Sequence, residues 1–198
     1  LLKLVDLTSG NERKLEMLLN VARLQEAIGE YQMALETRRR IMTMAPGDPT
    51  NFDEMVNLYD HLGKPEEYVK ALDAEMARIA DKKSAEARAR RLDLLFRKGV
   101  TIETSLNDKH EAAKLFDALL KEEPNHERTI AHLEERVRAG EAAMAAVALE
   151  RVYQQSGDWR KFIDVLEAQL SSTNEHEARK ALLITAAQTY QEKLNAQD

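Results

Sequence analysis

Apolar residues recur every three or four positions along most of this chain, which is the period of an amphipathic α-helix. In the first such stretch Leu15, Leu18, Leu19 and Ala22 fall on one face, and Gly29 ends it. The same spacing predicts further helices over residues 31–42, 51–62, 68–79, 85–105, 127–138, 141–155, 161–170 and 175–195, with another helical stretch between 107 and 123. The pattern therefore predicts an all-α protein.

Glycine and proline residues punctuate these helices. Pro46, Gly47 and Pro49 stop the helix over 31–42, because proline lacks the amide donor and glycine permits a turn. Pro65 is compatible with the first turn of the helix that follows it. Gly99 lies inside the long stretch 85–105, where we expect it to allow two helices to approach closely.

An internal repeat is visible at the turns between helices. Gly29-Glu-Tyr-Gln-Met-Ala34 is echoed by Gly63-Lys-Pro-Glu-Glu-Tyr68, 34 residues later, and by Asn107-Asp-Lys-His-Glu-Ala112. This period is the length of a helix–turn–helix unit, which must stack on its neighbours to bury its apolar face. Later steps are longer, since the turn residues Gly29, Gly63, Asn107, Gly157 and Asn195 are spaced by 34, 44, 50 and 38 positions. The predicted array is therefore irregular.

These residues resemble the tetratricopeptide repeat family. Its pattern has a small residue on the first helix, a glycine turn, Ala-x3-Phe on the second helix and a closing proline. The matching residues are Ala22, Gly29, Ala34 and Pro46 in the first unit, and Ala112, Phe116 and Pro124 in the third. Departures are Arg38 in the place of the second-helix aromatic, Tyr68 and Phe162 in place of the alanine, and Ala80 in place of the proline.

The resemblance implies a right-handed superhelix of stacked antiparallel helix pairs. We expect one array over residues 1–198, in units of approximately 12–49, 50–83, 84–124 and 125–174, with a partial unit at 175–198. Residues 1–7 resemble the end of a second helix, and the chain stops where the partner of its last helix would begin. We therefore expect a degenerate array from a larger, bacterial protein, truncated within a repeat at both ends.

Composition narrows the class of partner. The 198 residues carry a net charge of −6, which disfavours nucleic acid as a ligand. No apolar run approaches the roughly 20 residues needed to span a bilayer, so we expect no membrane insertion. The absence of cysteine excludes disulfides and thiolate sites but fits both cytoplasm and periplasm. No signal peptide is visible, which favours the cytoplasm; the oligomeric state is left open.

Catalytic, cofactor and metal sites are not expected. His110-Glu-Ala-Ala-Lys114 falls one residue short of the zinc-binding HExxH motif, because a lysine stands at the second ligand position. The sequence has no phosphate-binding loop and no nucleophile motif, and acidic pairs such as Glu66-Glu67 lie on predicted helix surfaces. We therefore predict that this chain is not an enzyme.

The expected function is protein–protein interaction. The resemblance implies that the concave groove, lined mainly by first helices, binds a peptide or helix of a partner, with Arg23, Asn57 and Tyr59 as the candidate contacts. Asp53 and Glu54 on the same surface argue against the chaperone carboxylate that some members of the family bind. A purely structural assembly scaffold, and a regulatory array fused to an enzyme outside this segment, remain the alternatives.

A basic segment offers a second candidate surface. Eight basic residues and three acids lie between Arg78 and Lys98. Arg88 and Arg91 in this segment could dock the carboxylates of an acidic partner, because arginine binds carboxylates in a bidentate manner. A solvated helix face is the alternative interpretation of the same charges.

Overall fold

The computed structural model describes residues 10–194, which form ten α-helices and a terminal π-helical turn, without a β-strand. The predicted all-α fold of stacked helix pairs is confirmed. The predicted segments at 1–7 and 195–198 lie outside the described residues. By its contacts the chain divides into two compact units, one ending at Asp81 and the other beginning at Lys82. Among the helices described over residues 10–194, none combines the length and the apolar composition that a membrane span requires.

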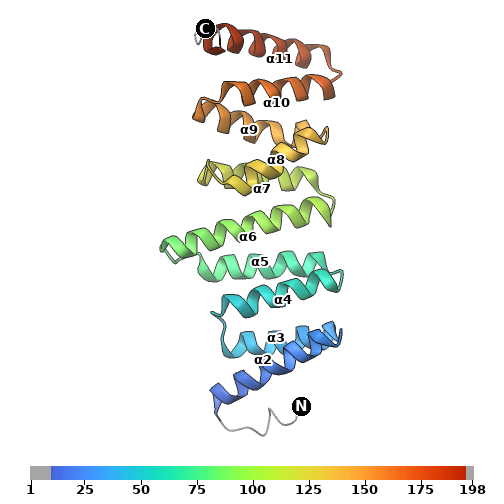
Figure 1. Cartoon of the computed structure of the whole chain (residues 1–198), viewed down its shortest axis with the longest axis vertical. Helices are drawn as coiled ribbons and strands as arrows, with labels where there is room; N and C mark the ends of the chain where they lie inside the picture. The colour runs from blue at the N-terminus through green and yellow to red at the C-terminus, as the bar shows by residue number, and fades with distance from the viewer. Residues whose placement is uncertain (1–9, 195–198) are drawn as a thin grey trace. The chain divides into compact units, whose positions relative to one another are not determined.

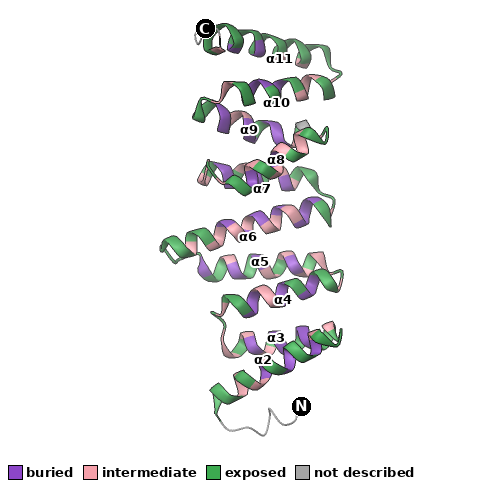
Figure 2. Ribbon diagram, in the orientation of Figure 1, coloured by how far each residue is buried: buried purple, intermediate pink, exposed green. Residues whose placement is uncertain are grey.

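The first unit consists of α2 (Asn11–Ala27), α3 (Tyr31–Met44), α4 (Pro49–His61) and α5 (Pro65–Ile79). Successive helices run antiparallel and are joined by short turns (Figure 1). Gly29 closes the first hairpin at a φ of +80° and Gly63 the second at +61°, in the left-handed region that favours glycine. The helices bury their apolar stripes against one another (Figure 2), and Leu18, Ala22 and Leu35 are fully buried.

The start of α4 differs from the prediction. Pro49 does not terminate structure but is the first residue of α4, two positions before the predicted start. The Asp48 carboxylate caps this helix, accepting hydrogen bonds from the backbone N–H groups of Thr50 (2.9 Å) and Asn51 (3.3 Å). A capping aspartate followed by proline is a strong start signal, since proline needs no hydrogen-bond acceptor in the first turn.

The second unit consists of α6 (Ala85–Thr104), α7 (Lys109–Glu122), α8 (Glu127–Arg138), α9 (Ala142–Ser156), α10 (Trp159–Ser172) and α11 (His176–Thr189), which continues into a π-helical turn over Tyr190–Leu194. Asn107 closes the α6–α7 hairpin at a φ of +55°. Asparagine thus takes the turn conformation that glycine takes in the first unit, as the repeat alignment predicted.

Two packing features of this unit bear on function. Three helices, α7, α8 and α10, pack against α9, and the short α8 is one of them. Helix α11 is largely exposed and presents Leu183 and Ile184 to solvent, and Tyr190 of the π-helical turn is exposed as well. The corresponding residues 88 positions earlier include Phe96 and Ile102, which are buried in the α6–α7 pair.

Candidate functional site

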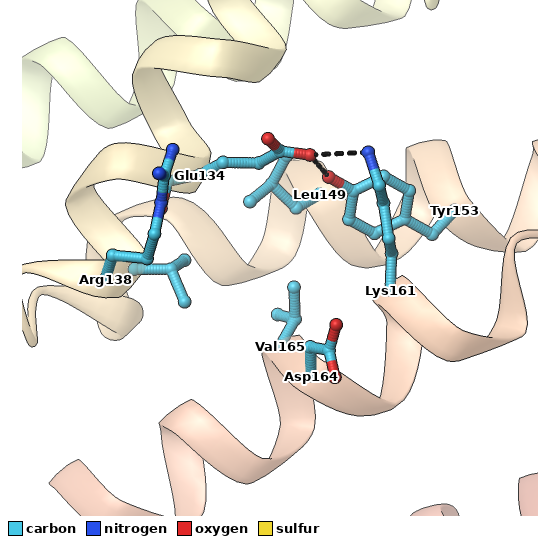
Figure 3. A pocket seen from close by; sticks show the side chains of 8 residues that line it. Glu134, Arg138, Leu149, Tyr153, Lys161, Asp164 and Val165 are labelled. Carbon is cyan, nitrogen blue, oxygen red and sulfur yellow. Dashed lines mark hydrogen bonds and ion pairs between the residues drawn. The ribbon is translucent and has the colours of Figure 1, made fainter.

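A pocket of about 220 Å³ opens between α8, α9 and α10 (Figure 3). Its surface is mostly apolar, and charged side chains stand at its edge. The lining residues are Glu134, Val137, Arg138, Leu149, Tyr153, Lys161, Asp164 and Val165. Helical spacing explains the convergence, because Glu134 and Arg138 on α8, like Leu149 and Tyr153 on α9, are four residues apart and share a face.

The Glu134 carboxylate joins the three helices at one side of this pocket. Its Oε1 accepts a hydrogen bond from the Tyr153 hydroxyl at 2.5 Å and from Lys161 Nζ at 2.9 Å. Lys161 Nζ also lies 5.5 Å from the centre of the Tyr153 ring. A carboxylate, a phenol and an ammonium group therefore hold one another in place beside the apolar floor (Figure 3).

The ionisation of these groups follows from the contacts. Burial favours the protonated form of Glu134, but the hydrogen bonds from Tyr153 and Lys161 outweigh burial and hold the pKa of Glu134 below its usual value. Burial and the adjacent carboxylate raise the pKa of the Tyr153 phenol far above its ordinary value. The hydrogen bond to Glu134 raises the pKa of Lys161. At neutral pH the site is thus a carboxylate, a neutral phenol and an ammonium ion.

Two further charges at the rim are available to a ligand. The Arg138 side chain is exposed, and its Nε donates only to the backbone carbonyl of Glu134, at 3.3 Å. Asp164 is exposed and has no hydrogen-bond or ion-pair partner among residues 10–194. A cation and an anion therefore flank the apolar floor, an arrangement suited to positioning a polypeptide with charges of both signs.

A second hollow, of about 310 Å³, lies within the first unit. Residues of α2, α3 and α4 line it: Glu26, Tyr31, Glu54, Asn57, Leu58 and His61. The rings of Tyr31 and His61 stack with centroids 4.7 Å apart and planes 10° from parallel. This hollow is more polar than the pocket between α8, α9 and α10, and two carboxylates reach it.

A fully buried arginine lies behind these two carboxylates. Arg38 of α3 is 0% exposed; its Nε donates to Glu26 Oε1 at 2.9 Å, and its Nη1 pairs with Glu54 Oε2. Nη1 also donates to Asn51 Oδ1 at 3.2 Å, and the Asn51 amide donates back to the Arg38 carbonyl at 3.2 Å. Arg38 thereby connects α2, α3 and α4 in the position where the family pattern has an aromatic residue.

The residues proposed from sequence as groove contacts fall in different environments. Arg23 is exposed on α2, and Asn57 is exposed and lines the hollow in the first unit. Tyr59, in contrast, is a core residue with 5% of its surface exposed, and its hydroxyl accepts a hydrogen bond from Arg39 Nη2 at 3.0 Å. Of the three, Asn57 lines the hollow described above.

The basic segment is extensively paired within the protein. Arg88 binds Glu123 Oε2 through Nη1 at 2.9 Å and the Glu122 carbonyl through Nη2 at 2.9 Å. Arg91 pairs with the Glu122 carboxylate, and Arg78 of the first unit pairs with Glu75. Arg88 and Arg91 therefore connect α6 to the end of α7, and the ion pairs neutralise much of the positive charge seen in the sequence.

Sequence patterns did not indicate the buried polar contacts of the second unit. Glu103 of α6 is 4% exposed, and its Oε2 is 2.5 Å from His132 Nε2 of α8. Arg136 Nη1 lies 3.5 Å from the other carboxylate oxygen. The His132 ring packs against Phe96 and Phe116, with centroids 5.9 and 5.1 Å away. Among residues 10–194 no three His, Asp or Glu side chains are placed together to bind a metal ion.

Comparison with known proteins supports the family resemblance. The tetratricopeptide repeat model matches residues 18–51 and residues 145–181. The first match covers α3 and most of α2, and the second covers α10 with most of α9. Among solved structures, the crystal structure of MamA protein is similar with a TM-score of 0.47 and 15% sequence identity, covering 91% of this chain and 94% of that chain. No curated protein matches the sequence.

Proposed function

We propose that this chain binds a segment of a partner protein in the pocket between α8, α9 and α10. The tetratricopeptide repeats whose family model matches residues 18–51 and 145–181 generally mediate protein–protein interaction, which supports this proposal. The second matched repeat, residues 145–181, supplies most of the pocket lining. The ligand is an extended or helical stretch of polypeptide, and the role of the array is binding without catalysis.

The observation that supports this proposal most directly is the apolar lining of the pocket, which lies between a positively charged and a negatively charged side chain. Val137, which is half-buried, covers the buried Leu149 and Val165 and provides the apolar surface against which one apolar side chain of the partner can pack. Burial of a leucine or phenylalanine side chain contributes about 1.5–3 kcal/mol. Arg138 and Asp164 add selectivity for a partner that carries an acid on one side of that residue and a base on the other.

A selection experiment tests this proposal without a known partner. A random library of 12-residue peptides displayed on phage is selected on the immobilised chain, and the enriched peptides are synthesised and their affinities measured. We expect enriched peptides to share an apolar residue between an acidic and a basic residue. Val137→Lys, which places a charged chain over the floor, and Arg138→Glu should each weaken binding at least tenfold.

The matched control is Arg160→Glu, an equal charge change at an exposed position of α10 outside the pocket. It should leave the affinity within twofold of wild type. Failure to enrich any peptide, or equal affinity of the wild type and Val137→Lys for the enriched peptides, would overturn the proposal.

A further inference from the structure

We propose that the exposed face of α11 and of the π-helical turn after it binds an amphipathic helix of a partner protein (Figure 2). The face consists of side chains spaced three or four positions apart, namely Lys180, Ile184, Ala187 and Tyr190. All four are exposed, and Ile184 and Tyr190 keep 49% and 45% of their surface accessible. This surface lies outside the lining of the pocket between α8, α9 and α10, and the inference does not depend on the function proposed for that pocket.

An internal repeat relates α11 to α6. At an offset of 88 residues, Leu94–Leu95 aligns with Leu182–Leu183, and Thr101 aligns with Thr189. The structure supports this alignment, because Thr101 and Thr189 are both 8% exposed. Each hydroxyl also donates a hydrogen bond to the carbonyl four residues earlier, at 3.0 and 2.8 Å. The two helices therefore bury an equivalent position in an equivalent conformation.

In α6 the face that corresponds to the proposed binding face belongs to a helix pair. The corresponding residues are Leu92, Phe96, Gly99 and Ile102. All four are buried, and α7 packs on α6 with the ring centroids of Phe96 and Phe116 6.1 Å apart. On α11 the same positions are exposed. The chain itself thus shows which kind of element covers such a face, namely an amphipathic helix similar to α7.

Charge complementarity indicates the direction of the partner helix. In the α6–α7 pair, Arg88 and Arg91 near the start of α6 pair with Glu122–Glu123 at the end of α7. Arg179 of α11 corresponds to Arg91, and the adjacent Lys180 is exposed without an ion-pair partner among residues 10–194. We therefore expect an antiparallel partner helix that carries acidic residues near its C-terminal end.

The size of one contact residue distinguishes the partner helix from α7. A Cβ atom at Gly99 would collide with the Phe116 ring, so glycine provides the space that this ring fills. The residue at the corresponding position of α11 is Ala187, whose Cβ takes up that space. Leucine should fit there better than phenylalanine, because overpacking is destabilising. The partner helix should therefore carry a small residue followed by leucine four positions later, as Ala112 is followed by Phe116 in α7.

The occupant that we infer is a different protein and not a second copy of this chain. The second helices of the repeats bury their apolar faces within the chain, since Ala34 of α3, Phe116 of α7 and Phe162 of α10 are at most 1% exposed. A second copy would have to release one of these helices from its own core before that helix could bind α11. A helix of another protein requires no such opening.

The test uses a peptide with the sequence of residues 107–124 and the change Phe116→Leu. The peptide is labelled with fluorescein and titrated with the whole chain, and binding is followed by fluorescence anisotropy. We expect it to bind about fivefold more tightly than the unmodified peptide. A peptide that also carries Glu122→Lys and Glu123→Lys should bind about fivefold more weakly than the peptide with Phe116→Leu alone.

Two variants of the chain locate the binding site. Ile184→Glu places a charge in the middle of the proposed face and should weaken binding of the peptide with Phe116→Leu about tenfold. Val147→Glu is the matched control, because Val147 is 70% exposed on α9 and lies outside both the face and the pocket lining. It should leave the affinity unchanged. Both replaced side chains are exposed, so the fold should tolerate either change.

The inference would be overturned if the peptide with Phe116→Leu does not bind, or if Ile184→Glu leaves its affinity unchanged. Equal affinity of the unmodified or the charge-reversed peptide would also contradict it. Sedimentation of the chain alone examines the second copy, since self-association that Ile184→Glu abolishes would assign the face to a dimer instead. All these outcomes are distinguishable from failure of the proposed function, because the peptides selected on phage respond to Val137→Lys and Arg138→Glu.

Discussion

Gly99 of α6 and Phe116 of α7 are in such close contact that a Cβ atom at residue 99 would lie 2.6 Å from Phe116 Cε1. Real Cβ atoms essentially never come that close to a neighbour. Phe116 is fully buried, so its ring has no free space into which it can turn. The predicted role of Gly99, to permit close approach of two helices, is therefore confirmed.

Gly99→Ala should lower the free energy of unfolding. Overpacking costs about 1–3 kcal/mol, whereas the better helix propensity of alanine returns at most about 1 kcal/mol. We expect a net loss of about 1–2 kcal/mol in urea titrations followed by circular dichroism. Combining Phe116→Leu with Gly99→Ala should recover part of this loss in unfolding free energy. Gly47→Ala is the control, since its nearest neighbour atom would be 4.0 Å away, and a comparable loss there would contradict the explanation.

Arg38→Ala should destabilise the first unit strongly. The change removes the cation that Glu26 and Glu54 share and leaves a cavity among three helices. Removing a large, fully buried side chain costs about 2–5 kcal/mol, whereas the two carboxylates left behind are partly exposed and can be hydrated. Arg38→Lys should lie between this variant and the wild type, because one ammonium group cannot reproduce the planar guanidinium contacts. Arg23→Ala, an exposed arginine on α2, should change the urea midpoint very little.

Glu134→Gln should reduce stability in a pH-dependent way. Because the pKa of Glu134 is below its usual value of 4.5 in the folded state, its stabilising contribution is complete above that pH. The contribution is lost as the pH falls through the lowered folded value. The difference in unfolding free energy between wild type and Glu134→Gln should therefore be largest near neutral pH and shrink in acid.

The neighbouring Glu135→Gln serves as the control for this experiment, because Glu135 is largely exposed on the same helix. Urea unfolding between about pH 3 and pH 7 measures both variants under identical conditions. A difference between wild type and Glu134→Gln that stays constant over this range would show that the hydrogen bonds to Tyr153 and Lys161 do not favour the ionised carboxyl.

Arg88→Glu with Arg91→Glu should weaken the contact between α6 and α7. The double change replaces ion pairs to Glu122 and Glu123 by repulsion, and we expect a loss of about 1 kcal/mol that diminishes at high salt. Adding Glu122→Arg and Glu123→Arg should restore about half of the loss or more. Unchanged stability of the double variant, measured by urea titration, would mean that these arginines are free for a partner.

Sequence alone predicted the helices well, because the apolar period is a local property. The predictions were wrong at helix boundaries, because a few polar capping contacts determine the residue at which a helix begins. Asp48 and Pro49 together start α4, although the proline was interpreted as the end of the preceding helix. The α10 helix begins at Trp159, two residues before the predicted start, with Asp158 as its cap.

The candidate sites were less predictable, because their residues meet only after the helices pack. Arg38 was recognised as a departure from the family pattern, but its partners lie 12 residues before it and 16 after it, on two other helices. The partners of Arg88 and Arg91 could not be recognised from the sequence, because they are more than 30 residues away along the chain. The lining of the pocket between α8, α9 and α10 has no motif that marks it in the sequence.

The buried Arg38 also affects how the first unit opens. Helical repeats can ordinarily lose one element at a time, since each contacts only its neighbours. Here the departure of α2 would take Glu26 away from a cation that has no access to water. The three linked helices should therefore exchange their amide hydrogens in one cooperative event, and α2 should not fray independently of α3 and α4.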